Sequence, residues 1–250
     1  GVRPDLAARL TGSAELFDRR KRRPWASVNY AASHDGFTLH DVVSYEEKHN
    51  KANGEGNRDG HGDNHSRNWG VEGETADPEI NETRARLKRA LLATVLFSAG
   101  TPMILAGDEM DRTQGGNNNA YCQDNETSWV DWKRASEDSA QSLLRYTARL
   151  IRLRRRLLPL RPPRFPHGQS QPMPGLADTE WFGQDGQPMT PEAWRDPIAK
   201  TFAMLRADYA THDDPDGGVD TVLLMINADS AELRSAPSYY AIASTRPIAE

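Results

Sequence analysis

The chain contains the same local pattern twice: a helix, then a short apolar strand, then a cluster of polar residues. In the first copy, a predicted helix over Pro4–Leu10 precedes a strand at Val28–Ala32, which ends in the cluster Ser33–Gly36. In the second copy, a helix that begins at Pro78 precedes a strand at Thr101–Ala106. Helices that alternate with strands are typical of a parallel sheet or barrel. The pattern predicts an α/β fold in which the polar strand ends meet, and in such folds ligands bind at that edge.

Each polar cluster contains acidic side chains. The first reads Ser-His-Asp-Gly and contains His34 and Asp35, while the second contains Asp108 and Glu109. A His beside an Asp at a strand end suits a ligand site, but Asp-Gly is also common in ordinary turns. On these residues alone, both interpretations stay open.

Local signals indicate two further helices and the ends of the helix that begins at Pro78. An apolar stripe with Glu and Lys on the other side predicts a helix over Thr38–His49. Asp77 is a favourable N-cap for the helix that begins at Pro78, and Gly100 would end it. Another helix is predicted over Ser139–Leu158, because Pro159 cannot continue it.

The character of the sequence changes after this last helix. A Pro-rich stretch over Arg161–Pro166 resembles a linker, and short strands are predicted at Thr201–Leu205 and Thr221–Asn227. We therefore predict one domain over residues 1–158 and a small antiparallel β domain over residues 159–250.

A long polar segment over Asn50–Gly73 is rich in Gly, Asn, Asp and His and has no periodicity. Its spacing does not fit a calcium-binding EF-hand, since the twelfth position would be Asn68 instead of a bidentate Glu. His61 and His65 could bind zinc, although no further Cys or His supports it. We favour an ordered loop held by bonds from side chains to the main chain.

A second polar loop contains amides and aromatic rings. Gly115–Asn125 is rich in Asn and leads to Trp129 and Trp132. Amides pair with sugar hydroxyls, and flat rings cover the apolar faces of pyranoses. The same residues also suit an ordinary ordered loop.

Composition excludes several classes of protein. The net charge of -5 argues against general binding to nucleic acids or anionic membranes, and no apolar run approaches the length that spans a membrane. The single cysteine, Cys122, permits no internal disulfide, which favours a cytoplasmic protein. Because the chain begins at Gly1 without an initiator methionine, we expect a fragment of a longer protein.

Three stretches in this order are specific enough to indicate a family. They resemble the glycogen debranching enzymes of the isoamylase type, in the α-amylase superfamily of glycoside hydrolases (family 13). The likeness is close from about Leu6 to Trp132. The stretches are Val28–Gly36, Gly100–Glu109 and Gly116–Asn125.

The resemblance implies the last part of a (β/α)8 TIM barrel followed by a C-terminal antiparallel β-sandwich, with Val28–Ala32 as strand seven and Thr101–Ala106 as strand eight. It implies hydrolysis of α-1,6 branch linkages in glycogen or a limit dextrin. We name no cofactor and no metal ligand among these residues. Asp35 matches the third catalytic carboxylate, and His34 matches a sugar-contacting His. We expect the second loop to line the sugar cleft beside Asp35, through Asn117, Asn118, Asn119 and Tyr121.

The chain also departs from the family. The nucleophile and the acid/base of these enzymes lie on strands four and five, which would precede Gly1, and Asp108 and Glu109 match a structural motif instead. We therefore expect the chain alone to be inactive. Alternatives are an α-1,4-acting hydrolase of the superfamily, a non-catalytic glucan-binding fragment, and an α/β domain in which His34 and Asp35 merely end a strand.

Overall fold

The computed structural model describes residues 2–210 and 218–229, which form two compact units. Unit 1 contains the described residues of Gly1–Asn29, Leu96–Thr101 and Ile151–Glu250. Unit 2 contains Tyr30–Val95 and Pro102–Leu150. The predicted domain boundary near residue 159 stays a prediction.

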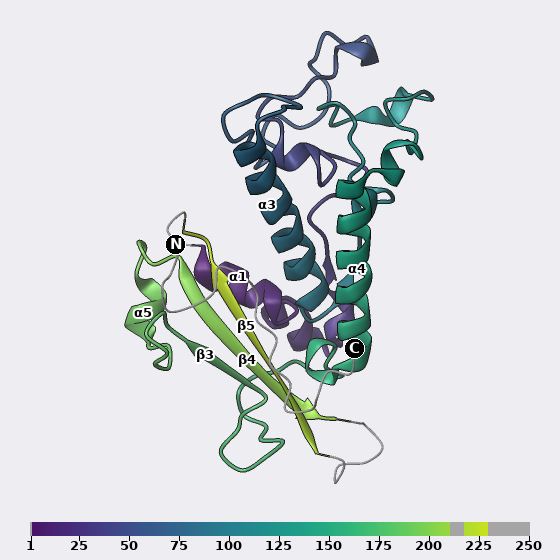
Figure 1. Ribbon diagram of the computed structural model, residues 1–250. Coiled ribbons are helices and arrows are strands. Elements are labelled where there is room, and N and C mark those ends of the chain that lie inside the picture. Colours follow the sequence, from purple (N-terminus) through teal and green to yellow (C-terminus); the bar gives the residue numbers. More distant parts are fainter. Residues whose placement is uncertain (1, 211–217, 230–250) are drawn as a thin grey trace. The chain divides into compact units, whose positions relative to one another are not determined.

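The described chain mixes helices and strands, which confirms the α/β class in its coarse form (Figure 1). The helices are α1 (Arg3–Leu10), α2 (Ala14–Phe17), α3 (Pro78–Phe97), α4 (Asp138–Arg156) and α5 (Pro191–Arg195). The strands are β1 (Val28–Asn29), β2 (Thr101–Pro102), β3 (Thr179–Phe182), β4 (Thr201–Tyr209) and β5 (Val219–Asn227).

Unit 1 contains an antiparallel sheet in the order β3-β4-β5 (Figure 1). The register pairs Met204 with Leu224, and side chains alternate between buried and half-exposed along β5. One face of the sheet is therefore buried, because successive side chains of a strand point to opposite faces of the sheet. The buried side chains of β4 and β5 are Phe202, Met204, Arg206, Val222, Leu224 and Ile226, together with Thr201, Ala207 and Asp220.

Arg154, near the end of α4, organises the turn that follows α3. Its guanidinium donates to the carbonyl oxygens of Leu96 at 2.6 Å, Ser98 at 2.8 Å and Gly100 at 2.5 Å. The last carbonyl groups of a helix have no partner within the helix, so a buried guanidinium is a suitable donor for them. Burial also lowers the pKa of Arg154 to about 10.

The two strands that precede the polar clusters are shorter than predicted. The Thr101 N–H donates to the Ser27 carbonyl at 2.7 Å, and β1 and β2 form a two-stranded sheet. An apolar strand that precedes a polar cluster in an α/β fold would be mostly buried, but Val28 is 51% exposed and Tyr30 is 55% exposed. A two-stranded sheet is too small to bury both of its faces.

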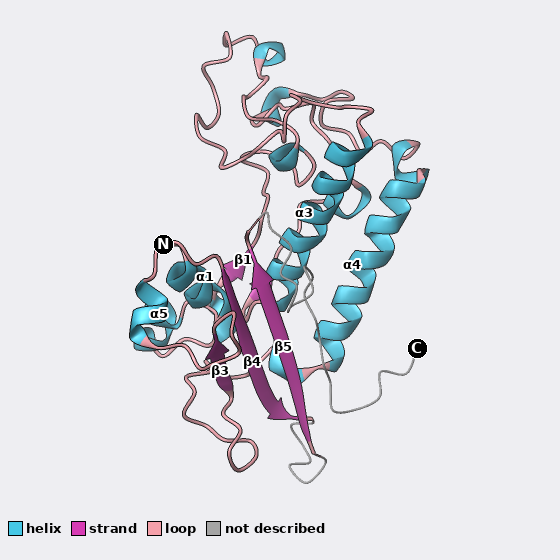
Figure 2. Ribbon diagram, turned by 60° about the vertical axis from the view of Figure 1, so that its left-hand side comes forward, coloured by secondary structure: helices cyan, strands magenta, loops and turns pink. Residues whose placement is uncertain are grey.

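In unit 2, local signals determine where α3 begins. The Asp77 carboxylate accepts the main-chain N–H groups of Glu79 at 2.9 Å and Ile80 at 3.2 Å, which confirms the predicted cap. Loops make up most of the chain between β1 and α3 (Figure 2).

The predicted helix over Thr38–His49 is wrong. Only a 3-10 turn forms there, at Asp41–Val43, and the segment is otherwise loop. Its polar side chains make bonds with residues about 70 positions away, such as the 2.9 Å bond from the Gln114 N–H to Asp41. Tertiary contacts therefore override the helical pattern.

Within residues 2–210 and 218–229, no helix is long and apolar enough to cross a membrane.

Candidate functional site

His34 and Asp35 lie in unit 2, on the turn that follows β1. Their side chains are 87% and 67% exposed, and the His34 Nε2 is 3.4 Å from the Asp35 Oδ2. The Ser33 hydroxyl donates to the Asp35 carbonyl at 3.0 Å. Both side chains are thus free to meet a ligand, as a substrate-contacting pair must be.

The Asn-rich loop adjoins this turn. The Gly36 N–H donates to the Asn118 carbonyl at 3.0 Å. The loop over 117–121 therefore lies next to the turn that carries Asp35. This is the proximity expected for loops that follow neighbouring strands. Whether these residues contact sugar stays a prediction.

The side chains of this loop are mostly bound to the protein itself. Asn117 is 2% exposed and donates to the Asn53 side chain at 2.9 Å. Asn118 is 1% exposed, and its amide donates to the His61 carbonyl at 3.0 Å. The buried amides at 117 and 118 therefore act as internal links, which composition alone does not reveal.

Two members of the loop are more accessible. Asn119 is half-buried, and its amide donates to the Asp59 carboxylate at 3.0 Å. Tyr121 is 72% exposed, and its hydroxyl donates to Glu55 at 3.0 Å. Of the predicted substrate contacts in this loop, these two side chains have the better access to a ligand.

Bonds from side chains to the main chain hold the segment over Asn50–Gly73, as predicted. The Asn57 side chain accepts the Asn50 N–H at 2.7 Å and donates to the Lys48 carbonyl at 3.0 Å. Such bonds replace a regular ladder of main-chain pairs. The described part of the chain holds no group of three or more His, Cys, Asp or Glu side chains suited to a metal ion.

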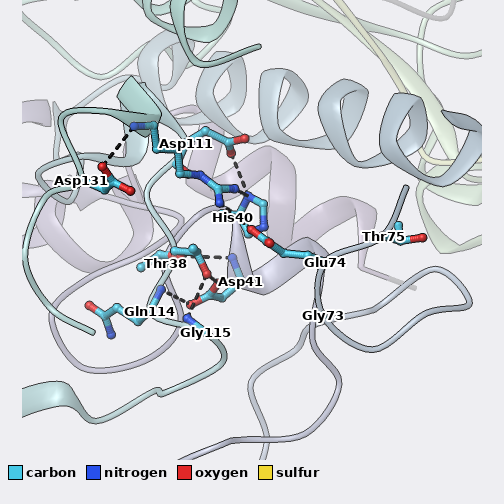
Figure 3. Close-up of polar contacts among 12 residues, drawn as sticks. Thr38, His40, Asp41, Gly73, Glu74, Thr75, Asp111, Gln114, Gly115 and Asp131 are labelled. Carbon is cyan, nitrogen blue, oxygen red and sulfur yellow. Dashed lines mark hydrogen bonds and ion pairs between the residues drawn. The ribbon is translucent and has the colours of Figure 1, made fainter. Parts of the chain in front are cut away.

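A buried carboxylate fixes the beginning of the Asn-rich loop (Figure 3). Asp41 is 0% exposed and accepts the N–H groups of Gln114 at 2.9 Å and Gly116 at 3.4 Å, together with the Thr113 hydroxyl. Burial raises the pKa of Asp41, while these donors and His40 oppose that rise. Asp41 therefore ties the segment after Asp35 to the loop that carries Asn117 and Asn118.

A second buried group joins three ionisable side chains. The Asp111 carboxylate lies 2.5 Å from the Lys88 Nζ and 3.0 Å from the His40 Nδ1, and Figure 3 shows the His40 contact. Burial opposes ionisation of Asp111, but His40 and Lys88 hold its pKa well below the ordinary value. Burial lowers the pKa of Lys88. This cluster could not be predicted from the sequence, because Lys88 stands among basic residues that helical spacing places together on one side.

Asp108, in the second polar cluster, faces the protein interior. It is 3% exposed, and its Oδ1 accepts the Leu39 N–H at 2.9 Å. Burial raises its pKa to about 7. Glu109 bonds back to the Gly107 N–H at 3.0 Å. Both carboxylates thus make contacts within their own unit.

Curated proteins similar to this chain are named glycogen debranching enzymes or GlgX homologs. The chain is 47% identical over 190 residues to a glycogen debranching enzyme of Cronobacter sakazakii, a match that covers 76% of this chain and 27% of that enzyme. It is 44% identical over 229 residues to a glycogen operon protein GlgX homolog of Mycobacterium bovis, a match that covers 90% of this chain and 32% of that protein. No model of a protein family matches.

Solved structures with a similar fold are pullulanases. Apo pullulanase from Paenibacillus barengoltzii aligns with a TM-score of 0.56 and 24% identity, covering 92% of this chain and 27% of the pullulanase. The complex of that pullulanase with maltohexaose and alpha-cyclodextrin aligns with a TM-score of 0.55. At this identity the likeness concerns the fold alone. The resemblance found in the sequence is confirmed by the curated relatives: this chain belongs with the glycogen debranching enzymes, and it spans only 27% and 32% of the two proteins compared.

Proposed function

We propose that the protein that carries this chain hydrolyses α-1,6-glucosidic branch linkages in glycogen or related α-glucans. The observation that supports this most is the exposed pair His34 and Asp35 beside the Asn-rich loop, in a chain 47% identical to a glycogen debranching enzyme. The α-glucan substrate is also consistent with the oligosaccharide complex of the similar pullulanase.

In this proposal β1 and β2 are neighbouring strands of a (β/α)8 barrel, and the β3-β4-β5 sheet is part of a C-terminal β-sandwich. In a barrel, one face of each strand packs against side chains inside the barrel and the other face packs against the outer helices. The rest of a barrel would therefore cover Val28 and Tyr30, which are exposed here.

Asp35 acts as the third carboxylate of the site. The transition state of glycoside hydrolysis resembles an oxocarbenium ion. A carboxylate that accepts hydrogen bonds from sugar hydroxyls stabilises that positive charge as it develops. His34, adjacent to Asp35 and more exposed, contacts the same sugar through a ring nitrogen.

The bond cleavage itself needs two other carboxyl groups. Retaining hydrolysis uses a nucleophile and an acid/base about 5–5.5 Å apart. By the resemblance, neither matches a position among these 250 residues, so we propose that residues outside them supply both. Asp108 and Glu109 are unsuited, because each already bonds to a main-chain N–H of its own unit.

The test measures reducing ends released by the protein that carries this chain from pullulan, amylopectin limit dextrin and linear amylose. We expect release from the two substrates with α-1,6 linkages and little from amylose. Release from amylose alone would instead indicate an α-1,4-acting hydrolase. Binding to glycogen in affinity electrophoresis without any release would indicate a non-catalytic glucan-binding protein.

A further inference from the structure

The exposed turn that carries His34 and Asp35 has few contacts of its own. Within residues 2–210 and 218–229, the Asp35 carboxylate makes one polar contact, the 3.4 Å approach to His34. The position of this carboxylate therefore depends on its main chain. The main chain is fixed on either side of the carboxylate by the Ser33 hydroxyl and by the bond from the Gly36 N–H to the Asn118 carbonyl.

Asn118 is held more firmly than an ordinary loop residue. Its main-chain N–H donates to the Asn50 Oδ1 at 3.0 Å, and its Oδ1 accepts the Asn50 Nδ2 at 2.8 Å. Its Nδ2 donates to the His61 carbonyl at 3.0 Å and to the Asn64 side chain at 2.6 Å. Asn118 is 1% exposed and Asn50 is 0% exposed, so water does not compete for these bonds.

The space around this pair of amides is closed. A methyl group at Gly60 would lie 2.2 Å from the Asn118 Oδ1 and 2.8 Å from the Asn50 Nδ2. The Asn50 amide also donates to the Asp59 carbonyl at 3.0 Å. The two side chains thus have one arrangement, which sets where the Asn118 carbonyl meets Gly36.

We propose that Asn118, held by Asn50, is a positioning residue for Asp35 and acts through the Asn118 carbonyl and the Gly36 N–H. This inference rests on the proposed function. In this inference, the buried Asn118 fixes the position of the Asp35 carboxylate without contacting that carboxylate. Misplacement of a reacting group by about 1 Å can reduce a rate by about a hundredfold.

The test is a double-mutant cycle in the protein that carries this chain. Asn118→Ala is combined with Asp35→Asn, and kcat and KM are measured on amylopectin limit dextrin. Asn118→Ala alone should lower kcat by about 10- to 100-fold, within the range for a misplaced group, and should change KM much less. In the Asp35→Asn background it should lower kcat by less than about threefold, because residues that act as a unit are not additive.

The matched control is Asn68→Ala, in the long segment that also contains Asn50. The Asn68 side chain bonds to Glu72 and to the Gly70 N–H, away from the contacts of Asn118. Any change in kcat that this substitution causes should be the same fold-change in the wild-type and in the Asp35→Asn background. If Asn118→Ala does not give the wild-type circular dichroism spectrum, Asn64→Ala serves instead, because it removes only the bond from the Asn118 Nδ2 to the Asn64 side chain. It should show the same dependence on the Asp35 background with a smaller loss of kcat.

Two outcomes would overturn the proposal, and they are distinguishable. If the wild type releases reducing ends and Asn118→Ala lowers kcat by the same factor in both backgrounds, the positioning role is wrong while the proposed function stands. If the wild type releases none from any substrate with α-1,6 linkages, the proposed function fails, and the positioning role fails with it.

Discussion

Replacement of Asp108 by Asn should stabilise the folded protein at neutral and alkaline pH. Asp108 is 3% exposed, and burial raises the pKa of its carboxyl from 3.8 to about 7. The folded state therefore binds this proton more tightly than the unfolded chain, so stability falls as the pH rises from about 4 through 7. A difference of about three pH units, at about 1.4 kcal/mol each, gives about 4 kcal/mol at pH 8. Asn keeps an oxygen for the Leu39 N–H and does not ionise.

The assay is hydrogen exchange, followed by mass spectrometry, of the peptide that contains Leu39, whose N–H donates to Asp108 at 2.9 Å. The ratio of wild-type to variant exchange rates at each pH cancels the intrinsic pH dependence. Since about 1.4 kcal/mol is a tenfold change, this ratio should rise by about two to three orders of magnitude between pH 4 and pH 8.

The control for this assay is Asp63→Asn, at a carboxylate that is 78% exposed in another loop. It should leave exchange at Leu39 unchanged at both pH values. An equal ratio for Asp108→Asn at pH 4 and pH 8 would refute the claim that the buried carboxyl ionises at a cost to the fold.

Three further outcomes are expected. Asp35→Asn should lower debranching kcat by orders of magnitude with an unchanged circular dichroism spectrum, and His34→Ala should lower it less; near-normal turnover of the first variant would exclude Asp35 from the site. Lys88→Met removes one partner of the buried Asp111 and should lower the free energy of unfolding by about 3–5 kcal/mol in denaturant titration, whereas addition of Asp111→Asn should recover part of the loss. Residues 1–250 expressed alone should release no reducing ends from glycogen, and sustained release by the pure chain would show that a catalytic pair lies within it.

Elements with strong local signals could be predicted from the sequence. Asp77 and Pro78 mark the beginning of α3, and the short apolar run within Thr221–Asn227 marks β5, because caps and apolar runs are signals between residues close in sequence. The segment Thr38–His49 shows the limit. Its apolar residues have helical spacing, but only a 3-10 turn forms, and the Asp41 carboxylate accepts the Gln114 N–H. A contact between residues so far apart cannot be predicted from the local sequence.

The proximity of the two loops could be predicted, but the state of their side chains could not. Loops that follow neighbouring strands were expected to meet, and the Gly36 to Asn118 bond joins them. That Asn117 and Asn118 are buried depends on partners such as Asn50 and Asn53, more than 60 residues away. The buried contact of Lys88 with Asp111 was missed for the same reason.

The choice of amides at this place has a physical consequence. An Asn side chain donates and accepts, so Asn50 and Asn118 join two main-chain segments without a net charge. Buried ions would have provided similar links, but they would also have changed the electrostatic potential at a nearby carboxylate and hence its pKa. The buried ion pair of Asp111 and Lys88 shows that the fold uses such links as well. The Asp41 carboxylate joins the two segments at Gln114 and Gly116. At the contact between Gly36 and Asn118 the links are neutral amides, which can fix the position of the turn without adding a charge next to Asp35.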